Sequence, residues 1–397
     1  MKTISPFVIF ALFSFLGSYT QADPIKLTDV SGKFSVTVEI VDVTGNSVRF
    51  KRADGTTGLV PIIKIDKDSL MRAINALDSP WDVAIINSTM AIRVNPEDAT
   101  AYYSRGFSHL QKDEFDKALA DFNKALELNP KDADVYYRAR AMVFLAKDNT
   151  DKAIVEYSKM ITLKPKDFIG YHLRGAAYLQ KKEFGTAVAD FTEAIELDPE
   201  EGGLFFDRAL AYRGLTEKDK AISDFSKAID LIPKGASGRF LREFAYYERG
   251  VSYLNTRNVD KAIADFSKIL VMDKFGNLPP VPVGKAYAKR GKAYFQKGEL
   301  DKAIADYSEA IEITPEYANV NFKRSPEYAN ACFNRGLAYG KKNEHDKAIA
   351  DFTEVIRVKP DDAYAYYNRG LAYRKNGDQA KAEADIAKAK ELGYETK

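Results

Sequence analysis

The chain has 397 residues, and its 59 lysines and arginines are almost matched by 57 aspartates and glutamates, for a formal net charge of +2. A balance this even argues against a protein that binds nucleic acid or an acidic membrane through its overall charge. The single cysteine, Cys332, excludes a disulfide within the chain, so packing must stabilise the fold.

Residues 1–22 have the pattern of a secretory signal peptide. Lys2 precedes an apolar run from Phe7 to Leu16, and Thr20-Gln21-Ala22 provides a small-residue exit. The apolar run is about half of what a bilayer span requires. We therefore expect cleavage, a periplasmic or secreted protein, and no integral membrane span after cleavage.

The next segment, residues 24–66, changes to short β-rich runs. Residues 34–41 and 47–52 alternate apolar and polar side chains, as half-buried strands do, and a third run follows at 58–63. Turn residues separate them at 44–46 and 53–55. Pro61 suits an edge or the end of a strand. The pattern predicts a small β module.

Residues 27–72 resemble the Sla homology domain in three short stretches, with Leu27 where that family usually has tryptophan. The matching residues are Thr28, Asp29, Ser31, Gly32, Lys33 and Phe34, then Val48, Phe50, Lys51, Ala53, Asp54 and Gly55, and finally Asp66, Lys67 and Asp68. The resemblance implies an SH3-like β-barrel over residues 24–66 that binds short peptides. A structural cap for the following helices is an equally good interpretation.

Residues 67–98 are interpreted as a degenerate leading repeat or linker. Ser79-Pro80 has the residue types that begin a helix. Small residues and a proline then follow at the spacing of the repeats described next. Repeat arrays commonly end in such atypical copies.

From Ala99 to the end, one pattern recurs eight times at spacings of 35, 34, 34, 41, 41, 45 and 34 residues. Within a frame of 34, position 8 is glycine or alanine, position 20 is alanine, and position 24 is a ring in seven copies. The frames begin at Ala99, Asp134, Phe168, Gly202, Glu243, Gly284, Ala329 and Ala363. The pattern resembles the tetratricopeptide repeat, which implies a mainly α fold: an α-solenoid of eight helix-turn-helix repeats over residues 99–397.

Position 7 is always arginine and position 23 is always acidic. In an antiparallel hairpin that turns near position 15, these two positions lie level and flank the apolar stripe, so we expect a bidentate, half-buried ion pair in each repeat. Two rival roles are a track of arginines for an acidic ligand, and pairing of the acid with the lysine at position 19. The predicted pairs are Arg105–Asp121, Arg140–Glu156, Arg174–Asp190, Arg208–Asp224, Arg249–Asp265, Arg290–Asp306, Arg335–Asp351 and Arg369–Asp385.

The resemblance also implies that the first helix of each repeat lines a concave groove, chiefly through positions 2, 5, 9 and 12. A groove this apolar suits the side chains of a peptide. Packing of these residues against the neighbouring repeat is the alternative. Position 5 is occupied by Tyr103, Arg138, His172, Phe206, Tyr247, Ala288, Phe333 and Tyr367.

Three insertions fall at successive repeat junctions, near residues 235–242, 275–284 and 317–325. The middle one contains Leu278-Pro-Pro-Val-Pro-Val283, which predicts an extended polyproline segment. The last is a partial duplication, since the sequence of 315–319 returns at 326–330. Insertions of this kind often lie on a binding edge.

Residues for catalysis do not gather anywhere in the sequence. His109, His172 and His345 are far apart, and there is no metal-ligand spacing and no phosphate-binding glycine loop. The sequence therefore predicts an exported, non-catalytic scaffold that binds a protein or peptide, with no cofactor, metal or nucleic acid. The alternative is a carbohydrate-binding protein or an enzyme that uses the aromatic groove. The oligomeric state is not predicted.

Overall fold

The computed structural model describes four strands between residues 25 and 61, and then residues 80–273, 280–313 and 326–395. The expected signal peptide at 1–22 lies outside the described residues. Among the residues that are described, no helix combines the length and the apolar character that crossing a bilayer would need.

The four strands form one antiparallel sheet in the order β1-β2-β3-β4. β2, β3 and β4 coincide with the three strands expected from sequence, whereas β1 was not predicted. The register of β2 against β3 shifts between Ile40 and Asp42. Pro61 is the last residue of β4, as expected for a strand end. The strands are β1 (Ile25–Thr28), β2 (Ser35–Thr44), β3 (Ser47–Lys51) and β4 (Thr57–Pro61).

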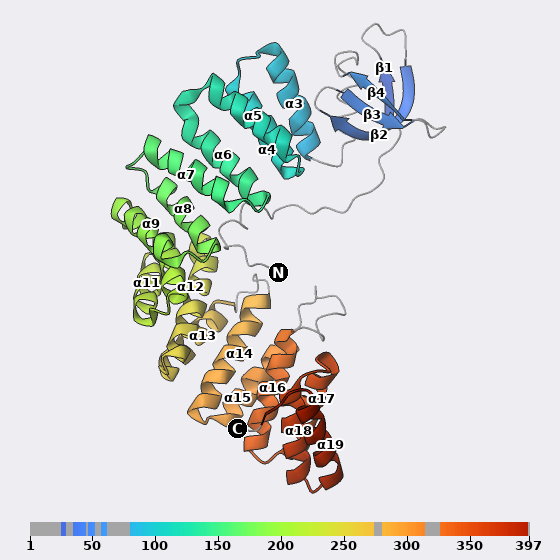
Figure 1. Cartoon of the computed structure of the whole chain (residues 1–397), viewed down its shortest axis with the longest axis vertical. Helices are drawn as coiled ribbons and strands as arrows, with labels where there is room; N and C mark the ends of the chain where they lie inside the picture. The colour runs from blue at the N-terminus through green and yellow to red at the C-terminus, as the bar shows by residue number, and fades with distance from the viewer. Residues whose placement is uncertain are drawn as a thin grey trace. The chain divides into compact units, whose positions relative to one another are not determined.

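After the sheet, the described chain is helical, with seventeen α-helices and one short 3-10 helix, η2 (Pro130–Asp132) (Figure 1). The α-helices are α3 (Pro80–Val94), α4 (Ala99–Gln111), α5 (Phe115–Leu128), α6 (Ala133–Ala146), α7 (Thr150–Leu163), α8 (Phe168–Gln180), α9 (Phe184–Leu197), α10 (Gly202–Gly214), α11 (Lys218–Leu231), α12 (Ala236–Asn255), α13 (Val259–Asp273), α14 (Pro280–Lys297), α15 (Leu300–Glu312), α16 (Pro326–Lys341), α17 (His345–Val358), α18 (Ala363–Lys375) and α19 (Gln379–Glu391).

The chain divides into two compact units, Met1–Leu197 and Asp198–Lys397. The first contains the sheet and α3 to α9, and the second contains α10 to α19. Each predicted repeat is a helical hairpin, from α4 with α5 to α18 with α19, and within each unit every hairpin packs against the next. The leading helix α3 begins at Pro80, as expected, and packs against α4.

The seam of each hairpin is closed by a small residue at position 8 that faces position 24, which is a ring in every repeat except the last, where it is Ile386. A methyl group added to Gly250 would lie 2.8 Å from Cε1 of Phe266, and one added to Gly106 would lie 2.8 Å from the same atom of Phe122. Both rings are fully buried. Burying such a ring stabilises the fold by about 2–3 kcal/mol, and the absence of a side chain at position 8 is what lets the helices approach this closely.

The turn between the two helices always has a left-handed residue at position 15. Gly298, Asn343 and Gly377, whose residue types adopt this conformation most readily, all have a positive φ. The structure adds five residues that are not glycine, namely Asp113, Asp148, Lys182, Thr216 and Arg257. In the first hairpin the next N–H, on Glu114, donates to the carbonyl of His109 at 2.9 Å, which satisfies a C-terminal carbonyl of α4.

Two of the insertions lengthen helices. The first extends α12 back to Ala236, ahead of the repeat frame that begins at Glu243. The polyproline prediction was wrong at Pro280–Val283, which form the first turn of α14. Proline is accepted there because the first N–H groups of a helix have no intrahelical partner to lose. The third insertion lies outside the described residues.

Candidate functional site

The arginine at position 7 and the acid at position 23 meet across each hairpin. In the fifth repeat, Nε of Arg249 donates to Oδ2 of Asp265 at 2.8 Å, and Nη2 donates to Oδ1 at 2.7 Å. Seven of the eight repeats, whose paired side chains all lie in the described residues, have this two-bond geometry. The other six pairs are Arg105–Asp121, Arg174–Asp190, Arg208–Asp224, Arg290–Asp306, Arg335–Asp351 and Arg369–Asp385.

These pairs are largely closed to solvent. The aspartate side chains in the fifth and seventh repeats are 6% exposed, and their arginine partners are 17% and 21% exposed. Burial raises the pKa of Asp265 and Asp351, and the partner arginine offsets this only in part. Each guanidinium is therefore engaged inside its hairpin, rather than being presented to a ligand as the arginine-track interpretation required.

A third contact joins six of the arginines to the repeat before them, and the sequence analysis missed it. Nη1 of Arg249 donates to the hydroxyl of Ser226 on α11 at 2.9 Å, and Arg290 reaches Ser267 on α13 at 3.0 Å. The signal was available, because position 25 is serine or threonine in every repeat but the first and the last. One arginine thus ties together three helices. The same contact occurs for Arg105 with Thr89, Arg174 with Ser158, Arg335 with Ser308 and Arg369 with Thr353.

The second repeat departs from this geometry. Nη2 of Arg140 donates to Oε1 of Glu156 at 3.0 Å, but Nε of Arg140 and Oε2 of Glu156 are buried without a hydrogen-bond partner. Lys159 also donates to Glu156 Oε1, at 2.7 Å. The extra methylene of glutamate displaces the carboxylate, so the two-bond fork is not formed.

The lysine at position 19 does not pair with the acid at position 23, contrary to the rival interpretation. In five repeats it contacts the acid at position 16 instead, one turn earlier. Lys302 lies 2.6 Å from Glu299, and Lys347 lies 2.7 Å from Glu344. The solvent screens these surface pairs, so they contribute little to stability.

The position-5 residues lie on the stripe formed by positions 2, 5, 6 and 9 of the first helices, which we call the first-helix face. Their rings pack edge-on or tilted against the buried rings at position 24 of the same hairpin. Centroid distances are 5.7 Å for Tyr103–Phe122, 6.0 Å for His172–Phe191, 6.0 Å for Tyr247–Phe266 and 5.6 Å for Phe333–Phe352.

Most position-5 side chains keep part of their surface in solvent. Tyr103, His172, Tyr247 and Phe333 are half-buried, and Arg138 is exposed. Tyr367 is half-buried and stacks on Tyr394 with centroids 4.1 Å apart. One side of these rings packs in their own hairpin while another side stays accessible, so their part in binding stays a prediction.

Phe206 is a correction to the predicted groove. It is 1% exposed and packs 5.7 Å from the Phe225 ring, so it cannot touch a ligand. Its helix, α10, contacts α12, whose first turns come from the insertion before Glu243. The frame alone could not show this, because the burial of one copy depends on packing between helices that the repeat pattern does not specify.

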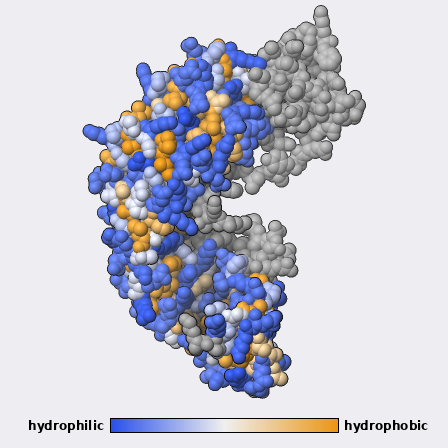
Figure 2. Space-filling view, in the orientation of Figure 1, coloured by the Kyte–Doolittle hydropathy of each residue, from blue (hydrophilic) through white to orange (hydrophobic). Residues whose placement is uncertain are grey.

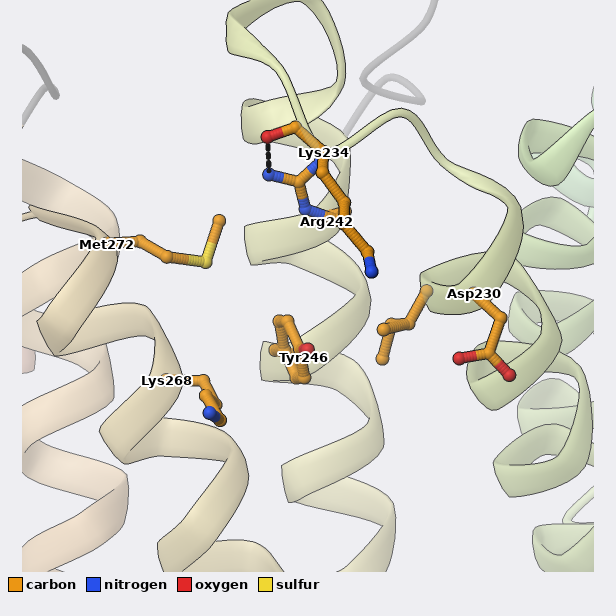
Figure 3. A pocket seen from close by; sticks show the side chains of 7 residues that line it. Asp230, Lys234, Arg242, Tyr246, Lys268 and Met272 are labelled. Atoms are coloured by element: carbon orange, nitrogen blue, oxygen red, sulfur yellow. Dashed lines mark hydrogen bonds between the residues drawn. The ribbon is translucent and has the colours of Figure 1, made fainter.

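A cleft of about 440 Å³ lies between α11, α12 and α13 (Figure 3). Ile229, Tyr246 and Met272 give it apolar walls. Arg242, although it lines the cleft, donates to the carbonyls of Pro233 and Lys234 just after the end of α11. The inserted turns of α12 form one wall of the cleft. Its most buried charged residue, Arg242, is hydrogen-bonded to the backbone just after α11.

The described residues contain no group of three His, Cys, Asp or Glu side chains placed to hold a metal ion. His109 lies in the core, 4% exposed, where most other repeats have tyrosine or phenylalanine. Cys332 is also buried, and burial raises the pKa of its thiol to about 11. A thiol in this state is a poor nucleophile.

Comparison with protein families identifies tetratricopeptide repeats in several parts of the array. One model described as TPR repeat matches residues 291–324 and 336–377. Two models described as tetratricopeptide repeat match 99–132, and 170–201, 203–234 and 363–392. The chain therefore carries tetratricopeptide repeats. A comparison with curated proteins found no match.

Two solved structures with TM-scores above 0.5 show the same fold at low identity. The apo form of RapI is 12% identical, with a TM-score of 0.56 over 74% of this chain and 97% of that one. The C-terminal part of a TPR repeat-containing protein from Cytophaga hutchinsonii is 18% identical, with a TM-score of 0.52 over 67% and 98%. A chain of the APC/C hetero-tetramer Cut9–Hcn1 is 18% identical, with a TM-score of 0.44 over 83% of this chain; the match spans only 58% of that chain.

Proposed function

We propose that this chain of tetratricopeptide repeats is a non-catalytic scaffold that holds a peptide segment of a partner protein on its first-helix face. The observation that carries the proposal is the row of half-exposed rings at position 5. Packing against the buried position-24 rings fixes each ring before a ligand arrives, so little side-chain entropy is lost on binding. Tyrosine and phenylalanine held in this way are typical binding anchors.

The mode of binding follows from how the apolar surface is distributed. Figure 2 shows hydrophobic residues as small areas among hydrophilic ones on the face in view. On the first-helix face, the position-5 rings are likewise interrupted by Arg138, by the buried Phe206 and by Ala288. Separated rings suit a peptide that inserts separated side chains, rather than a partner that buries one broad apolar patch. The ion pairs of the hairpins keep the helices in register beneath the rings.

The N-terminal sheet is included in the proposal as a second functional part of the chain. We infer that β1 to β4 belong to an SH3-like barrel of the Sla homology type, which either makes a second peptide contact or caps the array. The short antiparallel strands and the residues resembling that family support this. The pattern of residues 1–22 supports export, so we place the protein in the periplasm or outside the cell.

The test is capture of the partner by the full chain from an exported protein fraction, with a photo-crosslinking residue at position 247 to map the contact. Tyr247→Ala with Phe333→Ala should lower capture at least about tenfold, since two anchors of this kind typically contribute more than 1.4 kcal/mol together. The matched control is Val155→Ala with Val271→Ala, which removes exposed apolar side chains from second helices.

Two outcomes would contradict the proposal. Capture unchanged by the ring substitutions, or reduced equally by the valine substitutions, would move binding away from the first-helix face. The same variants should be tested with soluble oligosaccharides, because rings of this kind also stack on sugars. Binding of a sugar in place of a protein would favour the carbohydrate-binding alternative.

A further inference from the structure

Helix α14 carries three lysines along one side. Lys285, Lys289 and Lys292 are spaced by four and three residues, so their side chains follow one another along the helix surface. We call these three residues the lysine stripe. They occupy positions 2, 6 and 9 of the sixth repeat and therefore lie on the first-helix face. Arg290, whose guanidinium is paired with Asp306, points to the other side of α14.

The sixth repeat also has the smallest residue at position 5. Ala288 stands where the neighbouring repeats have Tyr247 and Phe333. The row of rings is therefore interrupted on α14, and the lysine stripe borders the interruption. The ring on each neighbouring first helix remains half-buried.

Lys289 lacks a counter-charge in the described part of the chain. Its pKa is lowered, first by burial and then by the charges of Lys292 and Lys285, and no carboxylate counteracts this. Two lysines of second helices differ from Lys289. Carboxylates raise the pKa of Lys302, which contacts Glu299, and of Lys347, which contacts Glu344.

The helices on either side of α14 do not supply the missing charge. Both α12 and α16 contact α14. On α12, the acid at position 6 is Glu248, which forms an ion pair with Arg213. On α16, the same position is Asn334, which is uncharged and donates its side-chain amide to the carbonyl of Asn330 at 2.7 Å.

A half-buried ammonium group between two like charges is electrostatically unfavourable, and a bound anion would remove the penalty. We propose that the lysine stripe binds carboxylate side chains of an acidic segment in the partner's peptide, next to apolar side chains that contact Tyr247 and Phe333. This proposal rests on the function proposed above and specifies the chemistry of the partner. Three charges along one helix match a short acidic segment, whereas a nucleic acid would require a longer basic surface.

The experiment uses the full chain and two fluorescein-labelled peptides. One alternates glutamate with leucine, and the other has glutamine in place of glutamate. Lys289→Gln with Lys292→Gln should weaken binding of the glutamate peptide about tenfold, and added salt should reduce this difference. The matched control is Lys261→Gln with Lys302→Gln, which removes the same charge from second helices. It should leave affinity within about twofold of the wild type, because those lysines lie on second helices and not on the first-helix face.

Three results would overturn the proposal: failure of the wild-type chain to bind the glutamate peptide, equal binding of the two peptides, or equal losses in the stripe and control variants. Circular dichroism of all variants verifies that they fold. Capture of the natural partner separates the two proposals. If the stripe variant retains capture and the Tyr247→Ala with Phe333→Ala variant loses it, the inference about acidic segments fails while the proposed function stands. If the ring variant retains capture, the proposed function itself fails.

Discussion

The second and fifth repeats differ by one methylene at position 23, where one has glutamate and the other aspartate. The comparison shows what the two-bond ion pair of the other repeats depends on. Asp265 meets both Nε and Nη2 of Arg249, whereas Glu156 meets only Nη2 of Arg140. The ion pair of the second repeat is left with two buried polar atoms that lack hydrogen-bond partners, Nε of Arg140 and Oε2 of Glu156. Opposite charges alone therefore do not ensure that both hydrogen bonds of the ion pair form. The length of the acidic side chain decides whether they do.

The largest expected effect comes from cutting the ion pair in each of these repeats. Arg249→Met strands Asp265, which is buried, and should cost about 3–5 kcal/mol. Arg140→Met should cost only about 1–2 kcal/mol, because Glu156 keeps its bond to Lys159 and the pair was incomplete at the outset. Urea unfolding, together with hydrogen exchange of α12–α13 and of α6–α7, measures both losses locally, since repeat arrays need not unfold as one unit.

A double substitution provides the control for this prediction. Arg249→Met with Asp265→Leu removes both charges and should recover most of the loss, as replacement of buried pairs by apolar residues often does. Equal losses for Arg249→Met and Arg140→Met would contradict the contrast between the repeats. A double variant no more stable than the single one would show that the stranded carboxylate is not the cause.

Rebuilding the fork in the second repeat should have a smaller effect of the opposite sign. Glu156→Asp brings the carboxylate to the length used in the other seven repeats, and satisfying both buried atoms should stabilise the chain by about 1 kcal/mol. The reverse change, Asp351→Glu in the seventh repeat, should destabilise it by a similar amount. Shifts in the urea midpoint measure both changes in stability. If both variants were less stable than the wild type, each repeat would be packed around its own acid, and the prediction would be wrong.

The hairpins and the partners within each ion pair could be predicted from sequence, because both depend on positions inside one frame. The contact from Arg249 to Ser226 was missed since it joins two repeats, and a frame treats each repeat alone. Phe206 was misplaced for a related reason. Its burial comes from how the neighbouring helices pack around this copy, which the repeat pattern does not specify. Likewise, prolines at 280 and 282 were taken as extended, although the first turn of a helix accepts them.

The fourth and sixth repeats differ in the residue at position 15 of the turn, and we expect this difference to have a smaller effect on stability. Thr216 has a φ of 63°, whereas the same position in the sixth repeat is Gly298 with a φ of 83°. A β-branched residue in the left-handed region costs roughly 1–2 kcal/mol, and the exposed Thr216 side chain has little packing to lose. Thr216→Gly should therefore raise stability by about 1 kcal/mol. Gly298→Thr should lower it similarly, and thermal melts showing the same sign for both changes would disprove this account.

The smallest effect concerns position 11, where the first repeat has His109 and the second has Phe144. His109 lies in the core with Nδ1 2.5 Å from Oε2 of Glu114 and Nε2 3.9 Å from Oδ2 of Asp121. Burial lowers its pKa below 6.5 despite these acids, with Lys117 adding to the decrease. The unfolded chain therefore binds more protons than the folded chain just below pH 6.5, so stability falls as the pH drops from there through the folded-state pKa.

His109→Phe should remove this loss, which we expect to be about 1 kcal/mol or less between pH 7 and pH 5. Urea midpoints of the wild type and the variant, measured at pH 7 and pH 5, give the loss of stability on acidification for each protein. An equal loss in the variant would assign the pH dependence to other groups.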